Sequence, residues 1–247
     1  EYGVGAGSAR FACTETELGS IPNHSTNLGN EMSSEILESL KNAKHAMSPD
    51  QNAWRKDIAF NALPKADYKN HILEFGVYEG RSISILASIW KDKTIYGFDS
   101  FYGLPEEWKI QPDKTHSIGH YSAHGELPIV PDNVHLFVGM FKYSIPEWKQ
   151  IHKGPISIIH IDCDIYSSTI TILEELNNQI EPGTVIFFDE LWPNLREFSS
   201  PPEPSEFYSE WEQHEWKALI EWLDKYDRDI EILYTYGRDS VAVRVTK

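Results

Sequence analysis

The chain has 247 residues and a formal net charge of −16, and this length suits one α/β domain with an extension. The acidic balance argues against nucleic acid or an anionic membrane surface as the main partner, and no apolar run approaches the roughly 20 residues that span a bilayer. Residues 1–12 lack the apolar segment of a secretory signal, and two cysteines are too few for a disulfide framework, so a reducing cytoplasm is the expected location.

The first 69 residues are predicted to form a flexible lead-in followed by a helical extension. Residues 1–30 are rich in Gly, Ser, Thr and Asn, which is typical of a flexible segment. Residues 31–62 are expected to form two helices, which Ser48-Pro49-Asp50 separates. We hypothesise that these helices pack on a second subunit. Because the chain does not begin with Met, it is interpreted as a trimmed chain or as a domain of a larger synthase.

Strand and helix patterns alternate from residue 71 to the C-terminus. The expected strands are 71–77, 94–98, 134–138, 156–162, 184–189, 230–235 and 240–245. The expected helices are 81–91, 143–152, 167–180 and 213–226. This alternation predicts a parallel sheet with helices on both faces. The short turn Tyr236-Gly237-Arg238 joins the last two strands, so one strand should be antiparallel, and residues 70–247 are interpreted as one domain.

A glycine-containing turn follows the first of these strands, in Glu74-Phe75-Gly76-Val77-Tyr78-Glu79-Gly80. Its glycines let the backbone turn sharply and approach a ligand, although a plain strand–helix turn is the alternative interpretation. Their spacing is not the Gly-x-Gly-x-x-Gly of dinucleotide binding, and no Gly-Lys-Ser/Thr is present for a nucleoside triphosphate. Asp99 ends the next strand, where a carboxylate can accept hydrogen bonds from a ribose diol or cap a helix. The pattern indicates a pocket that binds a nucleoside but has no phosphate-binding motif. Such a pocket suits S-adenosylmethionine, which carries a nucleoside and no phosphate.

Two segments, residues 100–133 and 191–212, are too long to be simple connections. Both should leave the carboxyl edge of the sheet, where a mobile lid and a solvated surface loop are both compatible with their composition. The first segment holds histidines that would share a face on a helix: His116, His120 and His124. Nearby glycines argue against that helix, so a polar loop is expected rather than a second metal site. His160 lies in a buried strand and is interpreted as a core histidine with satisfied hydrogen bonds.

Carboxylates follow two predicted strands at the point where each strand ends. Asp162 and Asp164 follow one, and Asp189 and Glu190 follow the next. Ligands of an open parallel sheet bind outside the carboxyl ends of its strands, so these side chains should surround one crevice. Such a cluster is costly unless something positive is present, and a hard divalent cation with oxygen ligands is the usual solution. Cys163, between the two aspartates, is interpreted as a small space-filling residue.

Four strings of the sequence resemble the class I methyltransferases: EFGVYEGRS, GFDSFYGLPEEW, HIDCDIYSST and EPGTVIFFDE. They occur in order within residues 70–247, and they most resemble the metal-dependent O-methyltransferases that act on sugars in macrolide and aminocoumarin biosynthesis, the macrocin type. The resemblance implies a Rossmann-like fold with a seven-stranded, mostly parallel sheet that contains one antiparallel strand, with helices on both faces and an N-terminal helical extension. Residues 1–69 match this pattern less clearly.

The resemblance also implies roles for matching positions. S-adenosylmethionine would contact Glu74, Gly76, Tyr78, Gly80, Ser82, Asp99, Ser100, Gly139 and Asp162. Mg²⁺ or another divalent cation would be bound by Asp162, Asp189 and Glu190, and Asp162 or Asp164 would be the general base. The family more often has aspartate where this chain has Glu190, which is longer by one methylene. Some relatives carry a histidine at the position of Ile165, so Asp164 is the better local candidate for the base.

The predicted function is Mg²⁺-dependent methyl transfer to a hydroxyl of a sugar-bearing or polyketide-type small molecule. A metal ion lowers the pKa of such a hydroxyl and orients it, and a carboxylate removes the proton. One alternative is a metal-dependent glycosyltransferase, because Asp162-Cys163-Asp164 is formally an Asp-x-Asp motif, although no basic grip for a pyrophosphate is evident. Another is a methyltransferase-like domain that only binds a ligand or partner, against which the nearly complete acidic set argues.

Overall fold

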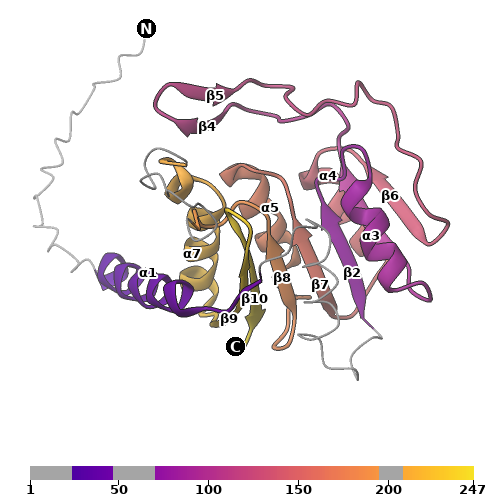
Figure 1. Cartoon of the computed structure of the whole chain (residues 1–247). Coiled ribbons are helices and arrows are strands. Elements are labelled where there is room, and N and C mark those ends of the chain that lie inside the picture. The colour runs from indigo at the N-terminus through magenta and orange to yellow at the C-terminus, as the bar shows by residue number, and fades with distance from the viewer. Residues whose placement is uncertain (1–23, 47–69, 195–207) are drawn as a thin grey trace, which may run out of the picture.

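A mixed sheet forms the centre of the computed structural model, which describes residues 24–46, 70–194 and 208–247 (Figure 1). Its strands are, in spatial order, β1 (His45–Ala46), β9 (Ile230–Tyr236), β10 (Ser240–Val245), β8 (Val185–Phe188), β7 (Ile156–Ile161), β2 (His71–Phe75), β3 (Ile95–Asp99) and β6 (Val134–Val138). Within the described part of this sheet, only β10 runs antiparallel to its neighbours. The seven expected strands and the single antiparallel strand are confirmed, and β1 adds an eighth, two-residue strand from the N-terminal extension.

Helices cover both faces of the sheet. One face packs against α1 (His24–Asn42), α4 (Phe141–Ile151), α5 (Tyr166–Leu176) and α7 (Glu215–Tyr226), and the other against α3 (Arg81–Ile89). Along β2 the side chains alternate between the two cores, with Leu73 in the first and Ile72 in the second. None of the described helices is both long and apolar enough to cross a bilayer.

The helix boundaries follow the predictions closely, with one correction at the N-terminus. α1 begins at His24, so residues 24–30, predicted to be flexible, belong to the helix. Its apolar stripe explains the helix, because Ile36 and Leu40 lie on one face and are buried in the larger core. The second N-terminal helix that was predicted lies outside the described residues.

The long segment 100–133 contains a short hairpin, β4 (Trp108–Gln111) with β5 (Lys114–His116), joined to a loop. Figure 1 shows β4 and β5 beyond the carboxyl ends of the central strands. The hairpin is anchored by a small apolar cluster that includes Trp108, Ile165 and Tyr208, and the Trp108 indole N–H donates to the Tyr208 hydroxyl at 3.1 Å. Most of the second long segment, at 195–207, lies outside the described residues.

Candidate functional site

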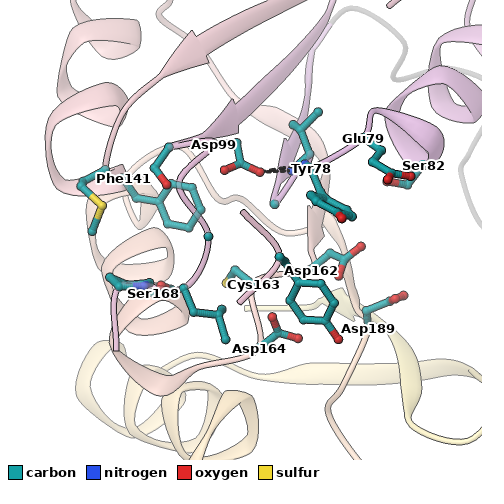
Figure 2. Close-up of a pocket in the computed structure, with 18 of the residues that line it drawn as sticks. Tyr78, Glu79, Ser82, Asp99, Phe141, Asp162, Cys163, Asp164, Ser168 and Asp189 are labelled. Atoms are coloured by element: carbon teal, nitrogen blue, oxygen red, sulfur yellow. Dashed lines mark hydrogen bonds between the residues drawn. The ribbon is translucent and has the colours of Figure 1, made fainter. Parts of the chain in front are cut away.

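A cavity of about 460 Å³ opens at the carboxyl ends of β2, β3, β7 and β8. Most of the residues predicted to contact the cofactor line it: Gly76, Tyr78, Ser82, Asp99, Ser100, Gly139 and Asp162. The carboxylates Asp164, Asp189 and Glu190 line the same cavity. Figure 2 shows Asp162, Asp164 and Asp189 in the lower part of the view and Asp99 and Ser82 in the upper part. Most of the residues predicted to contact the cofactor and the predicted carboxylates therefore line the same cavity.

Gly76 occupies a backbone position that no other residue fits. Its φ is +89°, a left-handed value that L side chains rarely adopt, and a Cβ added there would lie 1.7 Å from the carbonyl oxygen of Asp162. The chain is held in this position because Gly76 N–H donates to the Phe98 carbonyl at 3.0 Å and Asp162 N–H donates to the Phe75 carbonyl at 2.9 Å. The turn after β2 therefore lies directly against the peptide that carries Asp162.

Gly76→Ala is expected to destabilise the fold by more than the roughly 1–2 kcal/mol that a left-handed backbone alone costs an L residue, because the methyl group must also displace the Asp162 peptide. Urea unfolding of the metal-free protein measures the effect. Gly154→Ala is the matched control, since Gly154 has a φ of +96° and an added Cβ meets no atom within 4 Å. Equal losses in the two variants would contradict the close contact at Gly76.

Asp99 ties the turn after β2 to the end of β3. Its Oδ2 accepts the N–H groups of Val77 and Tyr78, both at 2.8 Å, and its Oδ1 accepts the N–H of Phe101 at 2.7 Å. Bends rather than a helix follow Asp99, so the helix-cap interpretation does not apply. A carboxylate oxygen has two lone-pair directions, so Oδ2 is fully used and Oδ1 can accept one further hydrogen bond from a ligand in the cavity.

The four predicted carboxylates fall in two overlapping groups of potential metal ligands, and the trio of Asp162, Asp189 and Glu190 stays a prediction. Potential ligand atoms of Asp162, Asp164 and Glu190 lie within 4.8 Å of one another, and so do those of His160, Asp162 and Asp189. Asp162 belongs to both groups, whereas Asp189 and Glu190 fall in different ones. Asp189 faces the β7 side chain His160, with 3.6 Å between Oδ1 and Nε2, whereas the backbone N–H of Glu190 donates to Glu215.

Asp164 is held in a strained conformation. Its φ is +66°, and Ile165 N–H donates to the Cys163 carbonyl at 2.7 Å, so Asp164 is the central residue of a tight three-residue turn. The side chain is buried, and burial together with the charges of Asp162 and Asp189 raises its pKa well above the ordinary value. Cys163 is buried, as predicted for a space-filling residue, and its thiol pKa is raised mainly by that burial.

Glu215 adds a fifth carboxylate that the sequence analysis missed. It is the first residue of α7, its side chain is 0% exposed, and its Oε2 accepts the backbone N–H of Glu190 at 3.1 Å. Glu215 Oε1 and Glu190 Oε2 are buried carboxylate oxygens without a hydrogen-bond partner. Burial and neighbouring acids raise the pKa of both carboxyls well above the ordinary value. No local pattern marks Glu215, because it reaches the site only through the packing of α7.

Two residues predicted to contact the cofactor lie behind the cavity wall instead. Glu74 is 0% exposed and is absent from the cavity lining, because its side chain lies on the face of the sheet that α3 covers, where it accepts hydrogen bonds from Ser82 and His160. Gly80 faces the side chains of Pro128 and Val130. His160 is buried and hydrogen-bonded, as predicted, but it also faces the acidic cluster.

The histidine-rich loop brings an aromatic residue to the cavity. The rings of His116 and His120 stack at 3.9 Å without a helix, and neither belongs to a potential metal group among the described residues. The ring of Tyr121 lies 4.3 Å from His120 and 5.9 Å from Tyr78, and Tyr121 lines the cavity. Burial and the charges of Asp164, Glu190 and Asp162 raise its pKa to about 12, so its hydroxyl stays protonated at neutral pH. Tyr121 was not predicted as a site residue.

Comparison with known proteins identifies the central part of the chain. A family model described as "Methyltransferase domain" matches residues 73–191, which run from β2 to the end of the acidic cluster. A curated relative, the 8-demethyl-8-(2,3-dimethoxy-alpha-L-rhamnosyl)-tetracenomycin-C 4'-O-methyltransferase of Streptomyces olivaceus, is 23% identical over 138 residues. That alignment covers 48% of this chain and 52% of the relative, so the chain matches about half of the relative's length.

Two solved structures share the fold. The O-methyltransferase NovP superposes with a TM-score of 0.52 at 17% identity, over 90% of this chain and all of that one. CalS11, described as calicheamicin methyltransferase, superposes with a TM-score of 0.51 at 17% identity, over 95% of this chain and 99% of that one. At these identities the superpositions establish the fold and not the substrate.

Proposed function

Because a methyltransferase family model matches residues 73–191 and two O-methyltransferases share the fold, we propose that this chain is a class I S-adenosylmethionine-dependent O-methyltransferase, and that it methylates a hydroxyl on a sugar-bearing natural product with the help of a divalent cation. The observation that carries the proposal is the cluster of carboxylates beside the glycine turn, within one cavity of about 460 Å³. The choice of a sugar hydroxyl as the acceptor is based on the relative, whose name describes a 4'-O-methyltransferase of a rhamnosylated tetracenomycin. A polyketide-type acceptor fits the same proposal.

The site fits S-adenosylmethionine at the carboxyl ends of β2 and β3. Gly76 lines the cavity at the turn, where it would face the methionine end of the cofactor, and Asp99 Oδ1 would accept a ribose hydroxyl. Tyr78, Ser82 and Gly139 line the same wall. The cavity volume is within the range of small-molecule sites, roughly 300–1,000 Å³. We assign this wall to the cofactor and the acidic wall to the acceptor.

The acidic wall fits a hard divalent cation such as Mg²⁺. Asp162, Asp164 and Glu190 offer oxygen atoms only, which is the donor type that Mg²⁺ prefers. The buried Oε2 of Glu190 lacks a hydrogen-bond partner, as expected of a carboxylate that faces a cation. Asp189 would complete the set from the other side of Asp162. When bound, the cation would supply Lewis acidity that lowers the pKa of an acceptor hydroxyl.

The chain's own residues would position the reactants and accept the proton. In the reaction, a bond forms between the acceptor oxygen and the methyl carbon as the bond from that carbon to sulfur breaks. The hydroxyl proton passes to a carboxylate, for which Asp162 and Asp164 are the candidates at this wall. The tight turn at Asp164 fixes the backbone that carries this carboxylate beside the cavity.

The two alternative functions are not favoured. A glycosyltransferase needs a cationic contact for a sugar-nucleotide pyrophosphate, and Arg81 alone among the cavity-lining residues is cationic. Its guanidinium pairs with Glu79 at 2.7 Å. A binding domain without catalysis would not need to preserve several buried carboxylates, which are costly to keep together.

The remaining expectations about partners stay predictions. Association through the N-terminal helices depends in part on residues outside the described ranges. Membership of a larger synthase and a cytoplasmic location also stay predictions, the latter from the two cysteines of the sequence.

Calorimetric titration of S-adenosylmethionine and of Mg²⁺, separately and together, tests the proposal. We expect micromolar cofactor binding that survives Asp189→Ala, and Mg²⁺ binding that is weakened in that variant because it removes one wall of the acidic cluster. Asp92→Ala, which removes an exposed carboxylate that does not line the cavity, controls for the change in net charge. A folded protein that does not bind the cofactor would overturn the proposal, and sugar nucleotides with Mn²⁺ would then be titrated.

A further inference from the structure

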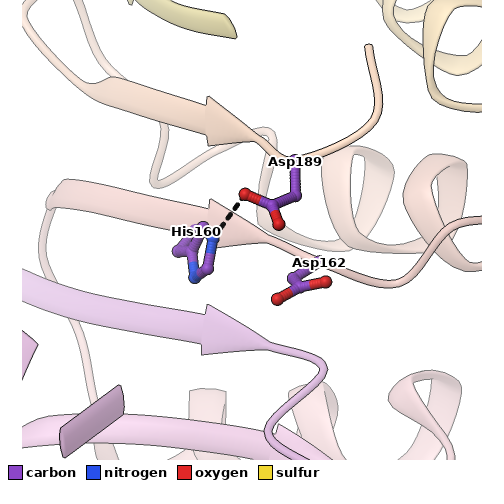
Figure 3. A group of neighbouring side chains, drawn as sticks. All are labelled: His160, Asp162 and Asp189. Carbon is purple, nitrogen blue, oxygen red and sulfur yellow. Dashed lines mark ion pairs between the residues drawn. The ribbon is translucent and has the colours of Figure 1, made fainter. Parts of the chain in front are cut away.

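A buried histidine lies between the two walls of the site. His160, on β7, is 1% exposed and stands opposite Glu74 of β2 in the sheet register. Its Nδ1 lies 3.0 Å from Glu74 Oε2, and its Nε2 lies 3.6 Å from Asp189 Oδ1 (Figure 3). The imidazole therefore spans three adjacent strands, from the one that carries the glycine turn to the one that carries Asp189.

The imidazole is fixed from the cofactor side. An ionised carboxylate only accepts hydrogen bonds, so Nδ1–H of His160 donates to Glu74. The other oxygen of Glu74 accepts the hydroxyl of Ser82 at 2.8 Å, and Ser82 lies in the first turn of α3, on the cavity wall. Because each Glu74 oxygen accepts a hydrogen bond, the orientation of the carboxylate is restrained. The carboxylate in turn orients the His160 ring.

The orientation of the His160 ring determines which ring atom faces the Asp189 carboxylate. Nε2 of His160 is directed at the acidic cluster, where a ring nitrogen and one oxygen each of Asp162 and Asp189 lie within 4.8 Å of one another. On its other side, Asp189 Oδ1 accepts the hydroxyl of Ser240 at 3.4 Å. Asp189 Oδ1 therefore lies between the His160 ring and the Ser240 hydroxyl, and its contact with Nε2 is attractive when that nitrogen also carries a proton.

We propose that His160 is a positioning residue that sets the direction of the Asp189 carboxylate, and that Glu74 and Ser82 hold His160 in place. The inference rests on the proposed function, in which Asp189 faces a divalent cation. Glu74 was expected from the sequence to contact the cofactor. In this proposal Glu74 instead holds His160, which in turn orients Asp189. Residues that orient a metal-facing side chain typically change metal affinity by about 10–100-fold when they are replaced.

Two substitutions of His160 separate a positioning role from a purely structural one. His160→Gln places its amide at the level of Nε2 and keeps a polar group beside Asp189. His160→Asn ends at the level of Nδ1, so it keeps the contact with Glu74 and loses the one with Asp189. We expect Mg²⁺ binding, measured by calorimetry, to weaken about 10–100-fold in His160→Asn and to stay within about threefold of the unchanged protein in His160→Gln. Binding of S-adenosylhomocysteine should be unchanged in both.

Equal Mg²⁺ affinity in His160→Asn and the unchanged protein would overturn the inference while leaving the proposed function intact. Equal losses in both variants would also overturn it, because they would indicate a structural role. If the unchanged protein binds neither Mg²⁺ nor Mn²⁺, the cation part of the proposed function fails and the inference fails with it.

Glu74→Gln provides a second test that keeps the size of the buried side chain, in case the His160 variants do not fold. We expect it to weaken Mg²⁺ binding by about tenfold, with S-adenosylhomocysteine binding unchanged. The reverse result, weaker cofactor binding with unchanged Mg²⁺ binding, would show that Glu74 contacts the cofactor and would overturn the inference.

Discussion

Asp162→Ala is expected to abolish measurable Mg²⁺ binding and to lower turnover by roughly 10³-fold or more, the largest loss among the carboxylate variants. Asp162 is the one residue shared by both groups of potential ligands, so its removal disrupts both. Asp164→Ala and Asp189→Ala each disrupt a single group, and we expect smaller losses of Mg²⁺ affinity for them. Calorimetry and a methyl-transfer assay with a sugar-bearing acceptor measure the two quantities.

A conservative variant keeps this test from depending on the fold alone. Asp162→Asn retains the size of the side chain and the backbone hydrogen bond to Phe75, so it should fold like the unchanged protein. It should nevertheless lose Mg²⁺ binding, because a neutral amide is a weaker ligand than a carboxylate. Turnover near that of the unchanged protein in Asp162→Asn would contradict both its role as a ligand and its role as a base.

The metal-free protein is expected to lose stability as the pH rises from 6.5 to 8, by roughly 5 °C in Tm. Burial and the charge of Asp189 raise the pKa of Asp239 to about 7, and the carboxyl pKa values of Asp164, Glu190 and Glu215 are raised further by burial and mutual repulsion. Groups with raised pKa values hold protons in the folded state that they release in the unfolded state. Their contribution to stability is therefore present at low pH and is lost as the pH rises through the folded pKa.

Mg²⁺ should reverse this trend, because a cation competes with protons for the same oxygens and binds more tightly at pH 8 than at pH 6.5. Melting curves with a chelator and with Mg²⁺ test both halves of the prediction. Below pH 6.5 the histidines act in the opposite direction, since burial lowers the pKa values of His152 and His214 and protonating them costs stability. Asp239→Asn should flatten the metal-free profile near pH 7. A flat profile in the unchanged protein would contradict the predicted repulsion.

The sequence was sufficient for features that depend on local pattern. Strand periodicity and the rule that ligands bind at carboxyl strand ends placed Gly76, Asp99, Asp162 and Asp189 at one cavity, because each of them ends a strand or starts the following turn. The short turn between the last strands predicted the antiparallel strand correctly. These inferences needed no knowledge of which helix packs against which strand.

Features that depend on packing between distant segments were missed. Glu215 enters the site because the start of α7 packs beside the end of β8, 25 residues away. Tyr121 enters through a loop whose histidines indicated only polarity. Glu74 was placed in the cofactor wall because it precedes the glycine turn, but its position in the strand directs it toward His160 instead. In each case the decisive contact joins two elements whose relative position is not encoded by the local sequence.

The short strand β1 has a consequence for any shortened form of this protein. It pairs with β9 through His45 and Ala46, and Thr235 N–H donates to the Lys44 carbonyl at 2.9 Å. Without residues 24–46, the last two residues of β9, Thr235 and Tyr236, would lose their strand partners, and unpaired strand edges are the kind of surface on which strands of other molecules add. The N-terminal extension thus covers this end of the β9 edge. A chain shortened to residue 70 would keep the cavity residues and lose that protection.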